Sequence, residues 1–267
     1  MIKAIVAGAA GRMGGRIIHM LEGAQGIVLA AAFEKAGHPA VGQDVGEVVG
    51  LPGKNIKITG SLAEALPSGD VLIDFTHPEV SLEHLKQAAP AGKAVVIGTT
   101  GFSAAQIEEV KKLAKNTRVV LAPNMSVGVN LMFKVVADIA KILSSGYDVE
   151  IVEAHHRLKK DAPSGTAMKL AQVIAGALER DLEQVGVYER KGMIGQRTDA
   201  EIGIQTVRAG DIVGEHTVMF GGIGERLEII HRAHNRDNFA RGAVRAAQWI
   251  VPQPQGLYDM QDVLGLK

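Results

Sequence analysis

The first half of the chain alternates short apolar runs with amphipathic stretches. The apolar runs are nearly uninterrupted Val, Ile, Ala and Leu, and they lie at residues 3–8, 27–33, 71–75, 94–98 and 119–122. Runs of this kind are typical of strands that are covered on both faces, as in a parallel sheet. The stretches between them predict helices at residues 12–22, 79–89 and 103–115. The alternation predicts βαβ units and a Rossmann-like, doubly wound parallel sheet of the α/β class.

The pattern changes after Pro123. Residues 127–143 place Leu131, Val135 and Ile139 on one stripe of a long amphipathic helix. The later runs alternate polar and apolar residues, at 148–154, 202–208, 213–220 and 226–234. Such alternation indicates a mixed or antiparallel sheet with one face covered.

These patterns predict two domains. The first is expected at residues 1–126, completed by residues 236–267, which include a final helix at 238–250. The second is an α+β domain at residues 127–235. Its one-sided sheet could supply an interface between copies of the chain.

Composition narrows the classes of function. The 267 residues are 46% hydrophobic and 22% charged, which is ordinary for a soluble globular protein. Lys plus Arg equals Asp plus Glu, at 29 each, so the basic excess that is typical of nucleic-acid binding is missing. The chain has no cysteine, no apolar stretch of about 18 residues and no signal-peptide pattern. We expect a cytoplasmic protein without nucleic-acid or membrane partners.

A glycine-rich loop follows the first predicted strand and opens the first predicted helix. It is a G-x-x-G-x-x-G run, Gly8-Ala9-Ala10-Gly11-Arg12-Met13-Gly14. Glycine allows a tight turn and a close approach of backbone to a pyrophosphate, and the helix start adds N–H groups and a positive dipole end. The run predicts dinucleotide binding; a purely structural turn is the alternative.

An acidic residue stands where the second predicted strand ends. Glu34 comes twenty residues after Gly14, and a carboxylate there can accept hydrogen bonds from both hydroxyls of an adenosine ribose. It would repel a 2′-phosphate, whereas the adjacent Lys35 could hold one. The pair therefore predicts that NADH and NADPH can each bind, unless Lys35 is simply a solvated side chain.

Two more loops are expected at the carboxyl ends of strands, where this fold presents ligands. Their sequences are Gly98-Thr99-Thr100-Gly101 and Ala122-Pro123-Asn124-Met125-Ser126. Small and hydroxyl residues allow backbone contact with a nicotinamide ribose and carboxamide. The alternative is a turn followed by a helix cap, for which Ser103 and Ser126 are suited.

The densest polar segment is residues 153–166, between a predicted strand and a predicted helix at 166–178. Its histidines, His155 and His156, titrate near neutral pH and can deliver a proton. Lys159 adds a cation, and the run Ser164-Gly165-Thr166 opens the helix, so its N–H groups and dipole attract anions. The segment suits a small carboxylate-bearing acid that is protonated beside a hydride transfer.

Three alternatives compete with this interpretation of the segment. Adjacent histidines seldom bind one metal, and neither cysteine nor an H-E-x-x-H spacing is present, so no metal is expected. Ser164 could be an ordinary helix cap among solvated cations. A phosphate or nucleic-acid site would use the three cations at positions 157, 159 and 160, but no aromatic residues accompany them.

This segment resembles the signature of the 4-hydroxy-tetrahydrodipicolinate (dihydrodipicolinate) reductase family. The matching string is Glu153-Ala154-His155-His156-x-x-Lys159-x-Asp161-Ala162-Pro163-Ser164-Gly165-Thr166-Ala167. Further landmarks follow in order over essentially the whole chain: the glycine loop, Asp74-Phe75-Thr76, Gly98-Thr99-Thr100-Gly101, and Asn124-Met125-Ser126-Val127-Gly128-Val129-Asn130.

The resemblance implies a dinucleotide domain, a substrate domain that closes on it, and a homotetramer. It implies reduction of a cyclic dicarboxylate to tetrahydrodipicolinate with NADH or NADPH, in diaminopimelate and lysine biosynthesis. His155 matches the proton donor, and Lys159 matches a lysine of catalysis and substrate binding. The matched substrate contacts are His156, Ser164, Gly165 and Thr166. The matched cofactor contacts are the glycine loop, Glu34, Lys35, Phe75, Gly98, Thr99, Thr100, Ala122, Pro123, Asn124 and Met125.

Two other functions fit part of the pattern. A different nicotinamide-dependent dehydrogenase of small acids would share the glycine loop but would not need the His-His-x-x-Lys segment. A non-catalytic NAD(P) sensor would keep Gly8, Gly11, Gly14 and Glu34 and would need no proton donor.

Overall fold

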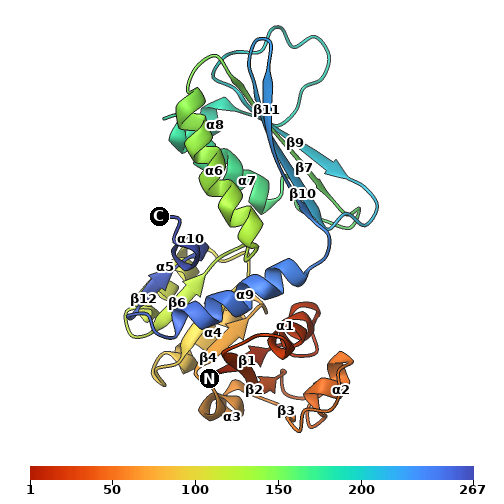
Figure 1. The fold of residues 1–267 in the computed structure, drawn as a ribbon, viewed down its shortest axis with the longest axis vertical. Helices are drawn as coiled ribbons and strands as arrows, with labels where there is room; N and C mark the ends of the chain where they lie inside the picture. Colours follow the sequence, from red (N-terminus) through yellow and green to blue (C-terminus); the bar gives the residue numbers. More distant parts are fainter. The chain divides into compact units, whose positions relative to one another are not determined.

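The computed structural model describes residues 1–267, which separate into two compact units (Figure 1). Unit 1 contains Met1–Val127 and Arg236–Lys267, and unit 2 contains Gly128–Asn235. These bounds lie within one residue of the expected domain limits, and the C-terminal segment returns to the first unit. The function of each unit stays a prediction at this point.

Unit 1 contains a seven-stranded sheet in the order β12-β6-β5-β4-β1-β2-β3, and every pair of neighbours is parallel. Its strands are β1 (Ile2–Ala7), β2 (Ile27–Phe33), β3 (Ile58–Thr59), β4 (Val71–Asp74), β5 (Ala94–Ile97), β6 (Arg118–Leu121) and β12 (Gly256–Tyr258). The order reverses between β1 and β4, so the sheet is doubly wound as predicted. In such a sheet, ligands bind at the carboxyl ends of the strands near this reversal.

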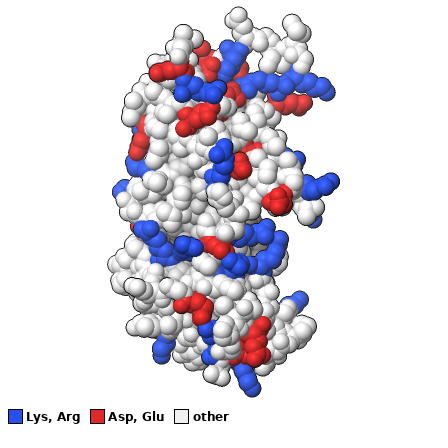
Figure 2. Space-filling model, turned by 45° about the vertical axis from the view of Figure 1, so that its right-hand side comes forward, with Lys and Arg blue, Asp and Glu red and all other residues white.

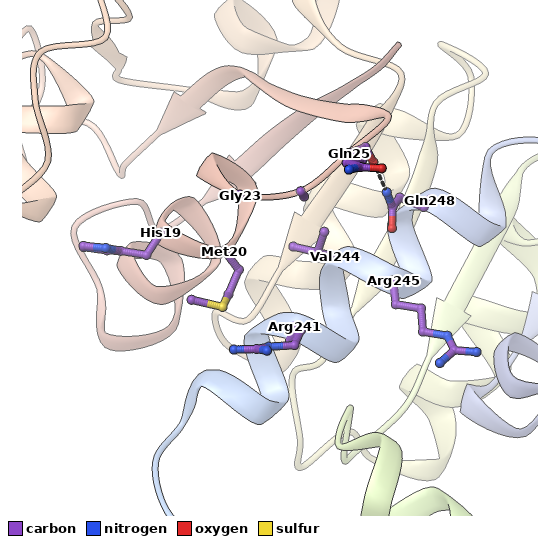
Figure 3. A pocket seen from close by; sticks show the side chains of 9 residues that line it. His19, Met20, Gly23, Gln25, Arg241, Val244, Arg245 and Gln248 are labelled. Carbon is purple, nitrogen blue, oxygen red and sulfur yellow. Dashed lines mark hydrogen bonds between the residues drawn. The ribbon is translucent and has the colours of Figure 1, made fainter.

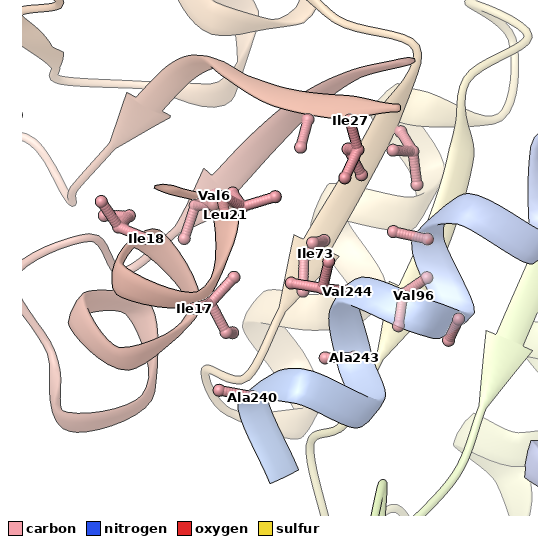
Figure 4. Packing of buried hydrophobic residues seen from close by; sticks show 14 of the residues in the cluster. Val6, Ile17, Ile18, Leu21, Ile27, Ile73, Val96, Ala240, Ala243 and Val244 are labelled. Atoms are coloured by element: carbon pink, nitrogen blue, oxygen red, sulfur yellow. The ribbon is translucent and has the colours of Figure 1, made fainter. Parts of the chain in front are cut away.

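Helices cover both faces of this sheet. They are α1 (Arg12–Glu22), α2 (Val45–Val49), α3 (Leu62–Ala65), α4 (Pro78–Ala88), α5 (Ala104–Leu113), α9 (Asp237–Ile250) and α10 (Met260–Leu264), with a 3₁₀ turn at Leu66–Ser68. Figure 4 shows Ile17, Ile18 and Leu21 of α1 and Ala243 and Val244 of α9 packed on one face of the sheet. A second core, under α3, α4 and α5, covers the opposite face.

Helix α9 fixes the loop that follows β6. A Cβ at Gly242 would lie 1.7 Å from the carbonyl oxygen of Met125, so only glycine permits this contact. At the start of α9, Asp237 accepts two hydrogen bonds of 2.5 Å from the Arg16 guanidinium of α1. Helix α9 therefore contacts both the loop after β6 and helix α1, two elements that are predicted to bind the cofactor.

Unit 2 contains a mixed sheet in the order β11-β10-β7-β9-β8. Its strands are β7 (Asp148–His155), β8 (Gly186–Val187), β9 (Ile202–Arg208), β10 (Gly214–Gly221) and β11 (Arg226–Ala233). Strand β7 runs parallel to β9 and antiparallel to β10. Helices α6 (Val127–Leu143) and α7 (Gly165–Ala177) bury their apolar stripes on one face, and α8 (Leu182–Val185) follows α7.

The predicted α/β class and the second, mixed sheet are confirmed. The sequence pattern did not predict the short strands. Strands β3, β8 and β12 have only two or three residues, too few to show a periodicity. They lie at sheet edges, where pairing with a neighbour decides the conformation.

The surface carries both signs of charge. Blue and red side chains are interspersed with large uncharged areas over the face shown in Figure 2, in keeping with 29 basic and 29 acidic residues. None of the helices is both long and apolar enough to span a lipid bilayer.

Candidate active site

The residues predicted to bind a cofactor all lie at one edge of the parallel sheet. The glycine loop follows β1, Glu34 and Lys35 follow β2, Phe75 follows β4, Gly98, Thr99 and Thr100 follow β5, and Ala122, Pro123, Asn124 and Met125 follow β6. The topology brings these five segments, far apart in sequence, to the carboxyl ends of the strands.

The glycine loop has a geometry that only glycine allows. Gly8 has a φ of 61°, in the left-handed region. A Cβ at Gly14 would lie 2.0 Å from the Gly8 carbonyl oxygen, and one at Gly11 would lie 3.0 Å from it. The loop is thus folded tightly against the start of α1. This geometry fits a pyrophosphate.

Glu34 lies against the same loop. Its carboxylate accepts from the backbone N–H of Ala10 at 3.1 Å and from that of Lys35 at 3.3 Å. Gly8, Glu34 and Lys35 line one cavity of about 440 Å³ in unit 1. A cavity of this volume next to the glycine loop suits the adenosine end of a dinucleotide.

The remaining members of the predicted cofactor set lie outside that cavity. The Phe75 ring packs on Gly98, where a Cβ would lie 2.1 Å from the ring. Asn124 accepts from the Ser126 N–H at 2.9 Å through Oδ1, which shapes the loop after β6. Met125 is buried, so its side chain is not available to a ligand.

A second cavity of unit 1, of about 590 Å³, contains none of the predicted residues. It lies between the end of α1 and helix α9. In Figure 3 the guanidinium groups of Arg241 and Arg245 point in different directions. They therefore do not converge on one ligand.

His155, the candidate proton donor of unit 2, lies against Glu153, a side chain with no exposed surface. Its carboxylate accepts from His155 Nδ1 at 2.5 Å and from the Ser164 N–H at 2.9 Å. The guanidinium of Arg208 donates two hydrogen bonds to the same carboxylate, of 2.8 and 2.9 Å. Four hydrogen bonds, two of them from the Arg208 cation, thus hold a carboxylate that would otherwise be costly to bury.

This arrangement fixes His155. Since Nδ1 is directed at Glu153, the remaining ring nitrogen, Nε2, is the atom that can exchange a proton with a ligand. A Cβ at Gly214 would lie 3.1 Å from Nε2, so glycine at this position keeps that edge of the ring open. His155 is therefore oriented as a proton donor would need to be.

Burial and hydrogen bonds determine two pKa values in this cluster. Burial alone would raise the pKa of Glu153, but hydrogen bonds from His155, Arg208 and the Ser164 N–H outweigh it and lower the pKa to about 2. Burial, aided by the nearby charge of His155, lowers the pKa of His216 to about 3. At neutral pH Glu153 is thus charged and His216 is neutral.

Lys159 and His156 complete the predicted set on the loop after β7. The Lys159 ammonium is 2.9 Å from a carboxylate oxygen of Asp161, whose side chain is mostly exposed. A ligand carboxylate could share this ammonium. Nδ1 of His156 is buried and has no hydrogen-bond partner in the protein.

Helix α7 begins beside this cluster. Ser164 is its N-cap and accepts from the Ala167 N–H at 3.2 Å. Gly165 and Thr166 form the first turn, and the backbone N–H groups of a first turn are directed out of the helix end. The first turn of α7 can therefore contribute N–H donors to an anion.

Sequence reasoning missed Arg208, Gly214 and His216. His216 pairs across the strands with Glu153 and lies 3.2 Å from Ser164 Oγ through Nε2. The sequence signal for His216 was its position in β10, where it alternates with Val218 and Phe220 on the face that the helices cover. A buried polar residue on such a face needs a partner.

Sequence models of a known family match both halves of the chain. The dihydrodipicolinate reductase N-terminus matches residues 2–125, and the dihydrodipicolinate reductase C-terminus matches residues 128–264. This chain belongs to the dihydrodipicolinate reductase family. It is therefore an oxidoreductase of a family that uses a nicotinamide cofactor.

Individual proteins agree with the family match. The 4-hydroxy-tetrahydrodipicolinate reductase of Syntrophobacter fumaroxidans is 60% identical and that of Geobacter sp. (strain M21) is 57% identical, each over the full length of both chains. A solved structure, dipicolinate-bound dihydrodipicolinate reductase from Paenisporosarcina sp. TG-14, is 27% identical, covers 98% of each chain and superposes with a TM-score of 0.75. An amine dehydrogenase from Mycobacterium smegmatis, 15% identical with a TM-score of 0.59, shares the fold.

Proposed function

We propose that this protein reduces 4-hydroxy-tetrahydrodipicolinate to tetrahydrodipicolinate with NADH or NADPH, as a step of diaminopimelate and lysine biosynthesis. Water leaves first, as the hydroxyl and a proton of the adjacent ring carbon, which forms a double bond between the two carbons. One hydride and one proton then saturate that double bond, so the net reaction replaces the hydroxyl by hydrogen and releases water. The observation that carries the proposal is the hydrogen bond between His155 Nδ1 and the buried Glu153, which leaves Nε2 as the proton-delivering atom.

The nicotinamide supplies the hydride when it is bound at the carboxyl edge of the unit 1 sheet. The glycine loop and the first turn of α1 would hold the pyrophosphate through backbone N–H groups. Glu34 would accept from the ribose hydroxyls, and Lys35 would attract a 2′-phosphate if one is present.

The substrate carries two carboxylates, for which unit 2 offers two kinds of group. The Lys159 ammonium would attract one carboxylate by charge, while the first turn of α7 at Gly165 and Thr166 would donate N–H groups to a carboxylate. His156 and Ser164 are the further substrate contacts that the family resemblance implies. His155, when protonated, would deliver its Nε2 proton to the ring carbon next to the one that receives the hydride.

Assembly is part of the proposal. The face of the unit 2 sheet that α6 and α7 do not cover exposes apolar side chains, among them Val207 and Ile230, each 43% exposed. We infer that copies of the chain pack through this face as a homotetramer of 28.2-kDa chains. Light scattering on the purified protein would measure the assembly, and a monomer would contradict this part. A cytoplasmic location also stays a prediction.

The test is NAD(P)H oxidation at 340 nm. The substrate is unstable, so it would be generated in the cuvette from pyruvate and aspartate semialdehyde by the preceding synthase. We expect oxidation that requires both precursors and the synthase. If the cofactor binds and no oxidation follows, the function is wrong, and another small acid or a sensor role takes its place.

A further inference from the structure

Asp74, at the end of β4, is a fully buried carboxylate that the reaction above does not use. One oxygen, Oδ1, accepts from the Thr76 N–H at 2.9 Å, from Thr76 Oγ1 at 2.6 Å and from Ser81 Oγ at 3.0 Å. The other, Oδ2, is 2.6 Å from His84 Nδ1. These donors include no lysine or arginine, so Asp74 is held mainly by groups that also face the ligand edge of the sheet.

The direction of each bond follows from the chemistry of the carboxylate. A carboxylate only accepts, so Thr76 and Ser81 each commit their single hydroxyl proton to Asp74. Ser81 Oγ also lies 2.7 Å from Thr99 Oγ1. Because the Ser81 proton is already committed, Thr99 must be the donor in that bond. The hydroxyl protons of Thr76 and Thr99 therefore point into the protein. Thr99 is buried, whereas Thr76 lines a cavity, so the Thr76 oxygen is left only as an acceptor for a ligand.

These two threonines lie where the cofactor is expected. Thr76 lines the 440 Å³ cavity together with His84, Gly8 and Glu34. Thr99 follows β5, in the loop predicted to contact the nicotinamide end. A single buried carboxylate thus controls hydroxyl groups in two segments of the cofactor site.

We propose that Asp74 sets the hydrogen-bond polarity of the cofactor site. By turning the hydroxyl proton of Thr76 inward, in the cavity that Glu34 also lines, it leaves an oxygen that only accepts and so favours a cofactor group that donates there. A ribose 2′-hydroxyl can donate to such an oxygen, whereas a 2′-phosphate only accepts. Asp74 is a positioning residue that favours NADH, opposing Lys35, and the inference rests on the proposed NAD(P)H binding.

Asp74→Asn tests the proposal with little change in volume. The amide nitrogen would donate to a hydroxyl oxygen and would free that hydroxyl's proton to turn outward. Dissociation constants for NADH and NADPH would be measured by cofactor fluorescence without substrate. We expect the Kd for NADH to rise about tenfold and that for NADPH to change less than about threefold. Equal weakening of both cofactors would overturn the proposal.

Thr117→Val is the matched control. Thr117 is buried, and its hydroxyl donates to the Lys93 carbonyl at 2.7 Å, at the amino-terminal edge of the sheet. Its loss should lower the free energy of unfolding and leave both dissociation constants unchanged. If Thr117→Val shifts the ratio of the two constants as Asp74→Asn does, the effect is general destabilisation and the proposal fails.

A second pair of variants covers the case in which Asp74→Asn does not fold. Thr76→Val removes the accepting oxygen, and we expect it to weaken NADH about tenfold; Thr76→Ser keeps the hydroxyl and should restore most of the affinity. NADH binding unaffected by Thr76→Val would contradict the proposal. A wild-type protein that binds neither cofactor would instead refute the proposed function, so the two failures can be told apart.

Discussion

Each unit buries a carboxylate that holds a histidine by Nδ1. In unit 1, Asp74 is 2.6 Å from His84, and in unit 2, Glu153 is 2.5 Å from His155. Both carboxylates have no exposed surface, and both also bind a hydroxyl and a backbone N–H. They differ in one respect, because Glu153 also faces Arg208 and Asp74 faces no arginine or lysine.

This difference indicates two uses of one local arrangement. Beside Arg208 the Glu153 charge is balanced, and its pKa falls to about 2, so it stays an anion beside His155. Asp74 is satisfied mainly by hydroxyls, so its effect is to orient those hydroxyls. The first arrangement suits proton delivery, and the second suits selection of the cofactor.

Glu153→Gln should have the largest effect. The amide cannot hold His155 as the carboxylate does, and it leaves Arg208 without its anion. We expect turnover to fall about 10²–10⁴-fold and the free energy of unfolding to fall by about 3–5 kcal/mol, with the Kd for NADH unchanged. Steady-state kinetics, fluorescence titration and urea unfolding would measure the three quantities. A weakened cofactor affinity with normal turnover would reverse the assignment of the two clusters.

Lys159→Ala should rank second. Loss of the ammonium removes a charge that attracts a substrate carboxylate, so we expect kcat/KM to fall about 100-fold, through both KM and kcat. Lys160→Ala is the control, because Lys160 is exposed on the same loop. Equal effects of the two substitutions would show that only the general charge of the loop matters.

Acid should lower the free energy of unfolding through the protonation of His216 in the unfolded state. Its pKa is about 3 in the folded protein and near 6.5 when unfolded, so the unfolded state gains the proton first. Between pH 7 and pH 5 this should lower the free energy of unfolding by about 2 kcal/mol. Below pH 4.5 Glu153 adds a further loss, because its pKa is lowered in the folded state. Urea unfolding at pH 7 and pH 5 should show a smaller difference for His216→Gln; an unchanged difference would exclude His216 as the cause.

Lys35→Ala should have the smallest effect. Lys35 is exposed at the rim of the cavity that Glu34 lines, so its contribution to 2′-phosphate binding is screened by solvent. We expect about tenfold weaker binding of NADPH and less than twofold change for NADH, with the difference shrinking as salt increases. If NADPH binding is unaffected, Lys35 is a solvated side chain.

The sequence alone predicts the helices and strands whose apolar residues recur at regular spacing. Strand β1, helix α1 and the glycine loop could be located because each combines an apolar run with a distinct terminus, and α6 because its stripe spans 17 residues. The functional string from His155 to Thr166 was visible because its residues adjoin.

The partners of these residues could not be found in this way. Arg208 and His216 lie 55 and 52 residues from the groups they bind, so their roles depend on the register of β9 and β10 against β7. Asp74 reaches Ser81 and His84 only because α4 packs beside the ends of β4 and β5. Such contacts follow from tertiary packing, which a local pattern does not encode.

The central claim is that unit 1 binds the cofactor and that His155 of unit 2 supplies the proton. It is tested most directly by mixing NADH-loaded His155→Gln with excess substrate and following a single turnover at 340 nm, after measuring its Kd for NADH. We predict a Kd within twofold of wild type and an oxidation rate about 10²–10⁴-fold lower. A near-normal rate would remove His155 from the reaction and contradict the account.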